Sequence, residues 1–217
     1  MENLRSPGRL RLIVEMGALF VAAPVVMAFI ATPGQLFPSI LPLLGIGLIL
    51  LHMTPDFRWS SILHGWQNTR ALLIAAAGLT TFIAGWIAIQ WLQPWATFWL
   101  WREERSVFWG LLVAYPLLSA LPQELIYRTL FFRRYAAILP TGRRAILLNA
   151  TLFALAHVMF WNWVVLLVTF LGGLLFAWSY RQRGLVEAWA LHGLTGFLLF
   201  VTGVGWYLTP EASARPF

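Results

Sequence analysis

Seven apolar stretches, most of them close to the length needed to cross a bilayer, restrict the fold of this chain more than any other feature. They cover about residues 11–31, 36–52, 71–92, 107–132, 145–160, 163–180 and 185–207. A membrane-spanning α-helix needs roughly 20 consecutive, mostly apolar residues. The sequence therefore predicts an all-α, polytopic transmembrane bundle of about seven spans in a cell membrane.

Composition supports a chain embedded in the membrane. Of its 217 residues, 60% are hydrophobic and 11% are charged, whereas a soluble domain has about 45–50% apolar and about 25% charged residues. The first apolar stretch is long and many others follow it, so it indicates a first span and not a cleaved signal peptide. The sequence shows no internal repeat and no low-complexity tract. We expect one integral membrane domain over residues 1–217.

The placement of arginine predicts the orientation of the bundle. If the N-terminus is cytoplasmic, eleven arginines fall on the cytoplasmic side: Arg5, Arg9, Arg11, Arg58, Arg70, Arg133, Arg134, Arg143, Arg144, Arg181 and Arg183. Three fall on the other side: Arg102, Arg105 and Arg215. Cytoplasmic loops carry an excess of basic residues, so this asymmetry predicts a cytoplasmic N-terminus. Contact with an anionic leaflet also explains the net charge of +7, and the expected partner is the lipid bilayer, not nucleic acid.

Two residue types that serve many enzymes are missing from the chain. It contains no cysteine, and every basic residue is arginine. The lack of cysteine excludes thiol catalysis, disulfides and cysteine-ligated metals. The lack of lysine excludes Schiff-base and lysine-nucleophile chemistry.

Three ionisable side chains, Glu124, His157 and His192, interrupt the apolar stretches. Such groups cost several kcal/mol in hydrocarbon, so each is a candidate functional residue. At about 1.5 Å of rise per residue, Glu124 and His192 each lie roughly 13 Å from the nearest cytoplasmic arginine of their own span, and His157 lies roughly 20 Å from its own. We expect the three to share one cavity opening toward the cytoplasm, where a carboxylate and two imidazoles can activate water.

The residues around Glu124 leave alternatives open. Arg128 lies four residues after Glu124, on the same helix face, so it either forms a structural ion pair or orients a catalytic carboxylate. Pro122 predicts a kink, which either admits water to the freed backbone groups or serves packing alone. For either histidine taken singly, the alternative is a hydrogen bond between helices.

Other polar residues are expected to be structural. Asn149 lies on nearly the same helix face as His157, and a hydrogen bond between helices is its expected role. Glu15 and Glu187 lie four residues after Arg11 and Arg183, respectively. This spacing predicts two local ion pairs near the inner interface.

The ordered set of these residues resembles the CAAX-protease and bacteriocin-processing (CPBP, or Abi) family of intramembrane glutamic-type endopeptidases. The family pattern is Glu-Glu-x-x-x-Arg on one span, Phe-x-x-x-His on the next, and His-x-x-x-Asn or His-x-x-x-Asp two spans later. The matching positions of this chain are Gln123, Glu124, Arg128, Phe153, His157, His192 and Gly196. The resemblance covers about residues 107–207. Two positions depart from the pattern: Gln123 replaces the first glutamate and Gly196 replaces the asparagine.

The resemblance implies hydrolysis of a peptide bond near the cytoplasmic side of the membrane, in a peptide or membrane-anchored protein substrate. In the family, a glutamate and the first histidine are understood to activate water, and the second histidine and the asparagine to stabilise the oxyanion. Carried over, Glu124 is the base or polariser of water and His157 its partner. His192 and Gln123 are then oxyanion donors, and Arg128 orients Glu124.

No cofactor is expected, and zinc held by the glutamate and the two histidines is the alternative mechanism. The alternative function is a catalytically impaired family member that acts as a membrane immunity or regulatory adaptor protein. Gln123, which cannot act as a general base, and Gly196, which has no side-chain donor, favour this alternative. A third hypothesis, a small transporter with a proton relay, is disfavoured by the lack of repeat symmetry.

Overall fold

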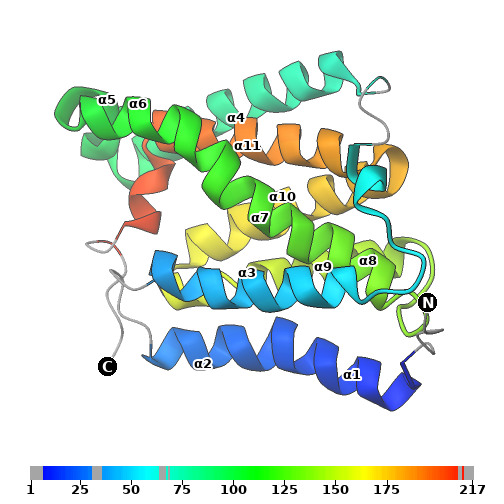
Figure 1. The fold of residues 1–217 in the computed structure, drawn as a ribbon. Coiled ribbons are helices and arrows are strands. Elements are labelled where there is room, and N and C mark those ends of the chain that lie inside the picture. The colour runs from blue at the N-terminus through cyan, green and yellow to red at the C-terminus, as the bar shows by residue number, and fades with distance from the viewer. Residues whose placement is uncertain (1–6, 31–35, 64–66, 68, 210–211, 213–217) are drawn as a thin grey trace.

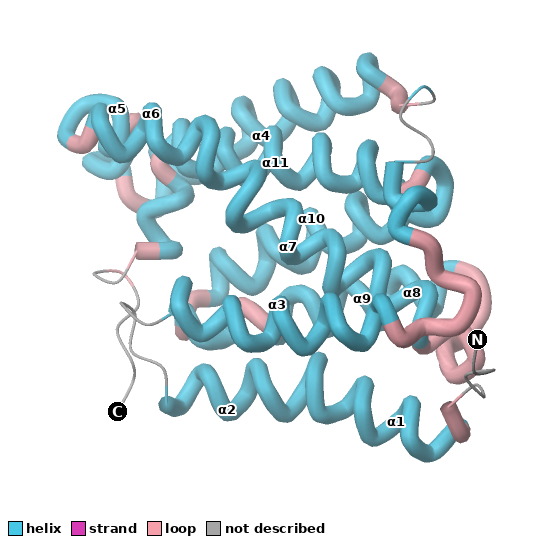
Figure 2. The backbone as a smooth tube through the Cα atoms, viewed as in Figure 1, coloured by secondary structure: helices cyan, strands magenta, loops and turns pink. Residues whose placement is uncertain are grey.

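The computed structural model describes residues 7–30, 36–63, 67, 69–209 and 212, with side chains from residue 41 onward in the second of these ranges. Within these ranges all regular secondary structure is helical (Figure 2). Six helical stretches of the described chain are long and apolar enough to cross a bilayer: Arg9–Ile30, Ala71–Leu92, Arg105–Arg134, Arg143–Phe160, Trp163–Arg183 and Leu185–Thr202. The apolar helix Leu41–His52 is shorter. The predicted all-α membrane bundle of about seven spans is confirmed.

The spans are built from the following helices: α1 (Arg9–Gly17), α2 (Ala23–Ile30), α3 (Leu36–His52), α4 (Ala71–Leu92), α5 (Trp99–Glu103), α6 (Arg105–Ala114), α7 (Leu121–Glu124), α8 (Phe131–Arg134), α9 (Arg143–Leu155), α10 (Trp163–Arg183) and α11 (Leu185–Thr202). Helix α11 packs against α4 and α10, and α10 packs against α9. These contacts place α11 in the interior of the bundle, and many of its side chains are buried.

Different helices reach the two ends of the bundle in Figure 1. Helices α1 and α8 lie at the right end, whereas α2, α5 and α6 reach the left end. Arg9 begins α1 and Arg133 lies in α8, so arginines from distant parts of the sequence gather at one end. The cytoplasmic location of that end stays a prediction, as does the single domain over residues 1–217. Arg5 and Arg215, which entered the prediction, lie outside the described residues.

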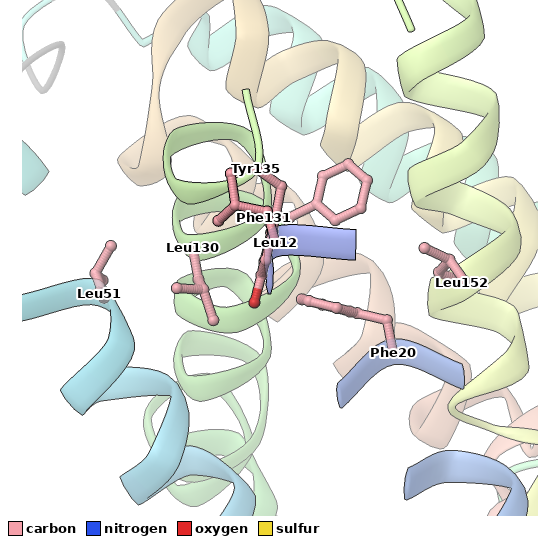
Figure 3. Close-up of a cluster of buried hydrophobic side chains, with 7 residues drawn as sticks. All are labelled: Leu12, Phe20, Leu51, Leu130, Phe131, Tyr135 and Leu152. Atoms are coloured by element: carbon pink, nitrogen blue, oxygen red, sulfur yellow. The ribbon is translucent and has the colours of Figure 1, made fainter. Parts of the chain in front are cut away.

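A hydrophobic cluster joins the first span to the arginine-rich end (Figure 3). Its buried members are Leu12, Phe20, Leu51, Leu130, Phe131, Tyr135 and Leu152. The Phe20 ring meets the rings of Phe131 and Tyr135 edge to face, with centroids 5.5 and 5.8 Å apart. Beside this cluster, the Glu15 carboxylate accepts hydrogen bonds from Arg134 and from the Tyr135 hydroxyl. The predicted local pair of Glu15 with Arg11 is therefore wrong, because Arg134 reaches Glu15 from a different span.

Glu187 is also paired across the bundle and not along its own helix. Its carboxylate accepts hydrogen bonds from the Arg70 backbone N–H at 2.7 Å, from the Arg70 guanidinium at 2.5 Å and from the Ser179 hydroxyl at 2.8 Å. The predicted pair with Arg183 is wrong, since Arg183 lies across a helix boundary at Gly184, where the chain turns from α10 into α11. This contact ties the start of α4 to the α10–α11 turn.

The long span of residues 105–134 is interrupted by two π-helical segments. They cover Tyr115–Ala120 and Leu125–Leu130 and lie on either side of α7. The irregular backbone is satisfied by other helices: the Trp189 indole N–H donates to the Pro116 carbonyl at 2.7 Å, and the Asn149 amide donates to the Tyr127 carbonyl at 2.5 Å. The helix–helix bond predicted for Asn149 is confirmed. Such π-bulges are frequent at functional sites.

Candidate active site

Three of the five predicted site residues form one buried cluster. Glu124 lies at the end of α7, and its Oε1 atom is 2.8 Å from Nδ1 of His192 on α11. Its Oε2 atom is 3.3 Å from Nε of Arg128. Glu124 and Arg128 are fully buried, and His192 is nearly so. The i,i+4 spacing predicted the ion pair correctly, and the similar depths of Glu124 and His192 predicted their meeting.

The charge of Arg128 is balanced without hydrogen bonds. None of its three guanidinium nitrogens has a hydrogen-bond partner, and neither does Glu124 Oε2. The guanidinium carbon instead lies 4.3 Å from the ring centroid of Phe153 and 5.6 Å from that of Phe176. Phe176 also stacks on His192, with centroids 4.6 Å apart. The cluster is thus a carboxylate and two basic groups enclosed by aromatic rings, where electrostatic interactions are strong.

His157 stands outside this cluster. It follows the last turn of α9, and its Nδ1 atom is 2.8 Å from the Phe153 carbonyl oxygen. A carbonyl oxygen can only accept, so Nδ1 carries the proton and Nε2 of the neutral ring is left with a free lone pair. The rings of Phe153 and Phe160 flank the imidazole, with centroids 4.8 and 6.2 Å away. His157 is therefore oriented as a base through Nε2.

Gln123 and His157 both line a cavity of about 390 Å³. The Gln123 side-chain amide donates to the Ser119 hydroxyl at 3.0 Å, and its Oε1 atom is buried without a partner. Tyr115 and Tyr127 line the same cavity. The remaining wall is mostly apolar and comes from several helices: Leu19, Pro24, Met27, Leu43, Leu44, Leu111, Leu118, Ile126, Met159, Phe160, Phe200 and Leu208. An apolar cavity with a few convergent polar groups is the usual form of a ligand site.

The cavity differs in two respects from the expected one, which was to be shared by Glu124, His157 and His192 and to open toward the cytoplasm. Glu124 and His192 do not belong to its wall, so the expected single cavity shared by the glutamate and both histidines is divided into a buried cluster and a cavity-facing pair. No hydrogen bond joins Glu124 to His157 among the described residues. The wall also includes Met159, Phe160 and Leu208, which follow α9 and α11 at the ends of these helices that lie away from Arg143 and Arg183. The cavity therefore extends toward the side opposite the predicted cytoplasmic one.

The donors present do not favour the alternative zinc site. Within the described parts of the chain, no group of three or more histidine, aspartate or glutamate side chains is gathered so that it could hold a metal ion. Glu124 is engaged by His192, and the Nδ1 atom of His157 is engaged by a backbone carbonyl. No reaction step is therefore derived through zinc.

Sequence reasoning missed three polar residues of the cavity wall, Tyr115, Ser119 and Tyr127. They are spaced from Gln123 at intervals of four residues, so they share its helix face, and that spacing is the signal that pointed to them. The separation of Glu124 from His157 had no such signal. Adjacent residues on a helix point in directions about 100° apart, so Gln123 and Glu124 necessarily face different surroundings.

Comparison with known proteins gives one match, to a protein family. Residues 105–198 match the family described as type II CAAX prenyl endopeptidase Rce1-like. This match covers less than half of the chain and supports the resemblance to the CPBP, or CAAX-protease, family of membrane-embedded proteases. The chain is an integral multi-pass membrane protein. The matched region contains all five predicted site residues. No curated protein and no solved structure matches the chain in the other two comparisons.

Proposed function

We propose that this protein is an intramembrane endopeptidase that hydrolyses a peptide bond at the polar pair Gln123 and His157. The observation that carries the proposal is that both side chains line one cavity, with the Nε2 atom of His157 free to accept a proton. The apolar remainder of the wall suits a substrate with a lipid-like group or an apolar segment. Because the family is described as a CAAX prenyl endopeptidase, a peptide with a prenylated cysteine near its C-terminus is the first substrate to test.

The proposed reaction uses His157 in two proton transfers. Its Nε2 atom takes a proton from water while the water oxygen forms a bond to the carbonyl carbon and the carbonyl oxygen becomes an oxyanion. The carbon–nitrogen bond then breaks, and His157 returns the proton to the departing amine. Gln123 Oε1, which lacks a partner, accepts a hydrogen bond from the same water and orients it. General base catalysis of this kind contributes about 10²–10⁴-fold.

Glu124, Arg128 and His192 are assigned positioning roles in this proposal. Glu124 is fully buried, does not line the cavity and already binds His192, so His157 replaces it as the base. The cluster packs against the same aromatic ring as His157, since Phe153 lies 4.8 Å from His157 and 5.6 Å from His192 between centroids. A change in the cluster therefore shifts His157 through Phe153.

The test is a cleavage assay in nanodiscs with fluorogenic peptides, prenylated and unprenylated. We expect wild-type protein to cleave at least one of them and His157→Ala to lose about 10²–10⁴-fold in kcat. His52→Ala is the matched control, because His52 ends α3 at the arginine-rich end, outside the cavity wall. Equal cleavage by wild type and His157→Ala would reject this mechanism.

A second candidate function, a binding protein that does not cleave, is favoured by one observation. None of the described residues that line the cavity carries a carboxylate. Gln123 occupies the position where the family pattern has its first glutamate. The variant Gln123→Glu separates the two candidates. Binding of a prenylated peptide without cleavage by the wild type, combined with cleavage by Gln123→Glu, would establish the binding protein and reject the endopeptidase.

A further inference from the structure

Tyr115 and Gly196 fit together in a way that depends on glycine. A Cβ atom added to Gly196 would overlap the Tyr115 hydroxyl oxygen and would lie 2.6 Å from two ring carbons of the phenol. Real side chains do not approach so closely, so any other residue at position 196 would displace the tyrosine. Gly196 is buried in the middle of α11, four residues after His192. The tyrosine side chain thus occupies the space that a side chain at position 196 would fill.

The Tyr115 ring is held in place, but its hydroxyl is free. The ring meets His192 and Phe200 edge to face, with centroids 6.1 and 5.5 Å apart. The hydroxyl has no hydrogen-bond partner among the described residues, although the side chain lines the cavity together with Gln123 and His157. A tyrosine hydroxyl in such surroundings normally finds a partner. A fixed donor without an acceptor, on the wall of a ligand cavity, indicates that the acceptor belongs to the ligand.

We infer that the Tyr115 hydroxyl donates a hydrogen bond to the carbonyl oxygen of a peptide bound in the cavity, and to the oxyanion formed there during hydrolysis. Gly196 leaves the room that this donor needs. The catalytic part of the inference rests on the proposed endopeptidase function. Removal of one oxyanion donor costs about 10²–10³-fold in kcat in enzymes that use them, because a fixed donor stabilises the developing charge more than it stabilises the substrate.

Three variants isolate the hydroxyl. Tyr115→Phe keeps the ring and removes the donor, so kcat falls about 10²–10³-fold with little change in KM. Gly196→Ala keeps the donor but displaces it, and the same loss is expected. The double variant Tyr115→Ala with Gly196→Asn offers a different N–H donor in the vacated space and regains part of kcat. Tyr207→Phe, outside the cavity wall, is the matched control and retains wild-type rates, and circular dichroism confirms that each variant is folded.

A binding measurement tests the role of the Tyr115 hydroxyl independently of cleavage. A phosphinate peptide carries tetrahedral, charged oxygens like those of the intermediate, and its affinity is measured by calorimetry next to that of the uncleaved parent peptide. We expect Tyr115→Phe to weaken phosphinate binding about 10²-fold or more and parent peptide binding far less. If His157→Ala abolishes cleavage while Tyr115→Phe keeps wild-type kcat, the tyrosine assignment fails and the endopeptidase stands. If the wild type cleaves nothing, the endopeptidase fails, and equal phosphinate affinity of wild type and Tyr115→Phe then also overturns the donor.

Discussion

Glu187 and Glu124 are both inaccessible to solvent, yet their charges are balanced in different ways. Glu187 receives hydrogen bonds from a backbone N–H, a guanidinium and a hydroxyl. These bonds hold the pKa of the Arg70 guanidinium above its usual value. The Arg70 side chain is 30% exposed, so water completes its solvation. Neither residue has a buried side-chain polar atom without a partner, as in a structural ion pair at the edge of a bundle.

Glu124 lies in a cluster with unused hydrogen-bonding capacity. One carboxylate oxygen meets His192, whereas the other oxygen and all three nitrogens of Arg128 have no hydrogen-bond partner. Buried polar atoms without partners are rare in native proteins and require an explanation. The cluster packs against Phe153, which also packs against His157, and it lies within the region that matches the Rce1-like family model. The comparison teaches that one buried glutamate joins helices through satisfied hydrogen bonds, while the other lies in a charged cluster with unsatisfied polar atoms, next to the proposed reaction site.

Removal of the Glu124 charge is the change with the largest expected effect. Glu124→Gln leaves the guanidinium of Arg128 fully buried without a counter-charge, and loss of one partner of a buried pair costs about 3–5 kcal/mol. The free energy of unfolding, measured in detergent by denaturant titration, is the readout.

The double variant Glu124→Gln with Arg128→Met tests the cause of that loss. It removes the stranded charge, so stability returns toward the wild-type value. A double variant as unstable as Glu124→Gln would show that the ion pair is not what Glu124 contributes.

Glu187→Gln is expected to have a smaller effect, about 2 kcal/mol, because hydrogen bonds to a charged group contribute about 1.5–3 kcal/mol and Arg70 regains water at the surface. Cleavage of a peptide by the folded variant stays at the wild-type rate, since Glu187 lies at the α10–α11 turn and not at the cavity. Denaturant titration and the cleavage assay are run on the same preparation. A loss of cleavage without a loss of stability would break the distinction between the two glutamates.

Asn149→Ala has the next smaller effect, about 1 kcal/mol. The substitution leaves the Tyr127 carbonyl without its donor, and hydrogen bonds between transmembrane helices contribute about 0.6–2 kcal/mol. Thr151→Ala, on the same helix, is the control, because the exposed Thr151 hydroxyl donates only to its own helix, at the Leu147 carbonyl. Equal thermal stability of both variants would show that the π-helical segment does not need the amide.

These contrasts also show what the sequence can predict. Apolar length defined the spans, and helical spacing predicted the contact of Glu124 with Arg128 and its shared depth with His192. The partners of Glu15 and Glu187 could not be predicted from spacing, because Arg134 and Arg70 come from other spans and lateral packing is not encoded in a local pattern. The same limit applies to His157. Depth along the membrane normal is only one coordinate, so two residues at similar depth can still face different surroundings. Gln123 and Glu124 do so although they are adjacent on one helix.

Chelation is expected to have the smallest effect, and it tests whether the Glu124 cluster is only a support. A zinc site would need Glu124 to leave His192 or His157 to leave the Phe153 carbonyl, and both bonds are 2.8 Å long. Tetrahedral zinc also needs several donors at about 2 Å, whereas the described residues contain no gathered group of three. Cleavage measured with 1,10-phenanthroline therefore equals cleavage without it, and a control metalloprotease in the same buffer loses activity. Inhibition that is reversed by added zinc would indicate that Glu124 is a zinc ligand and not a positioning residue. The difference between Glu124 and Glu187 would then be metal binding and not unsatisfied hydrogen bonds.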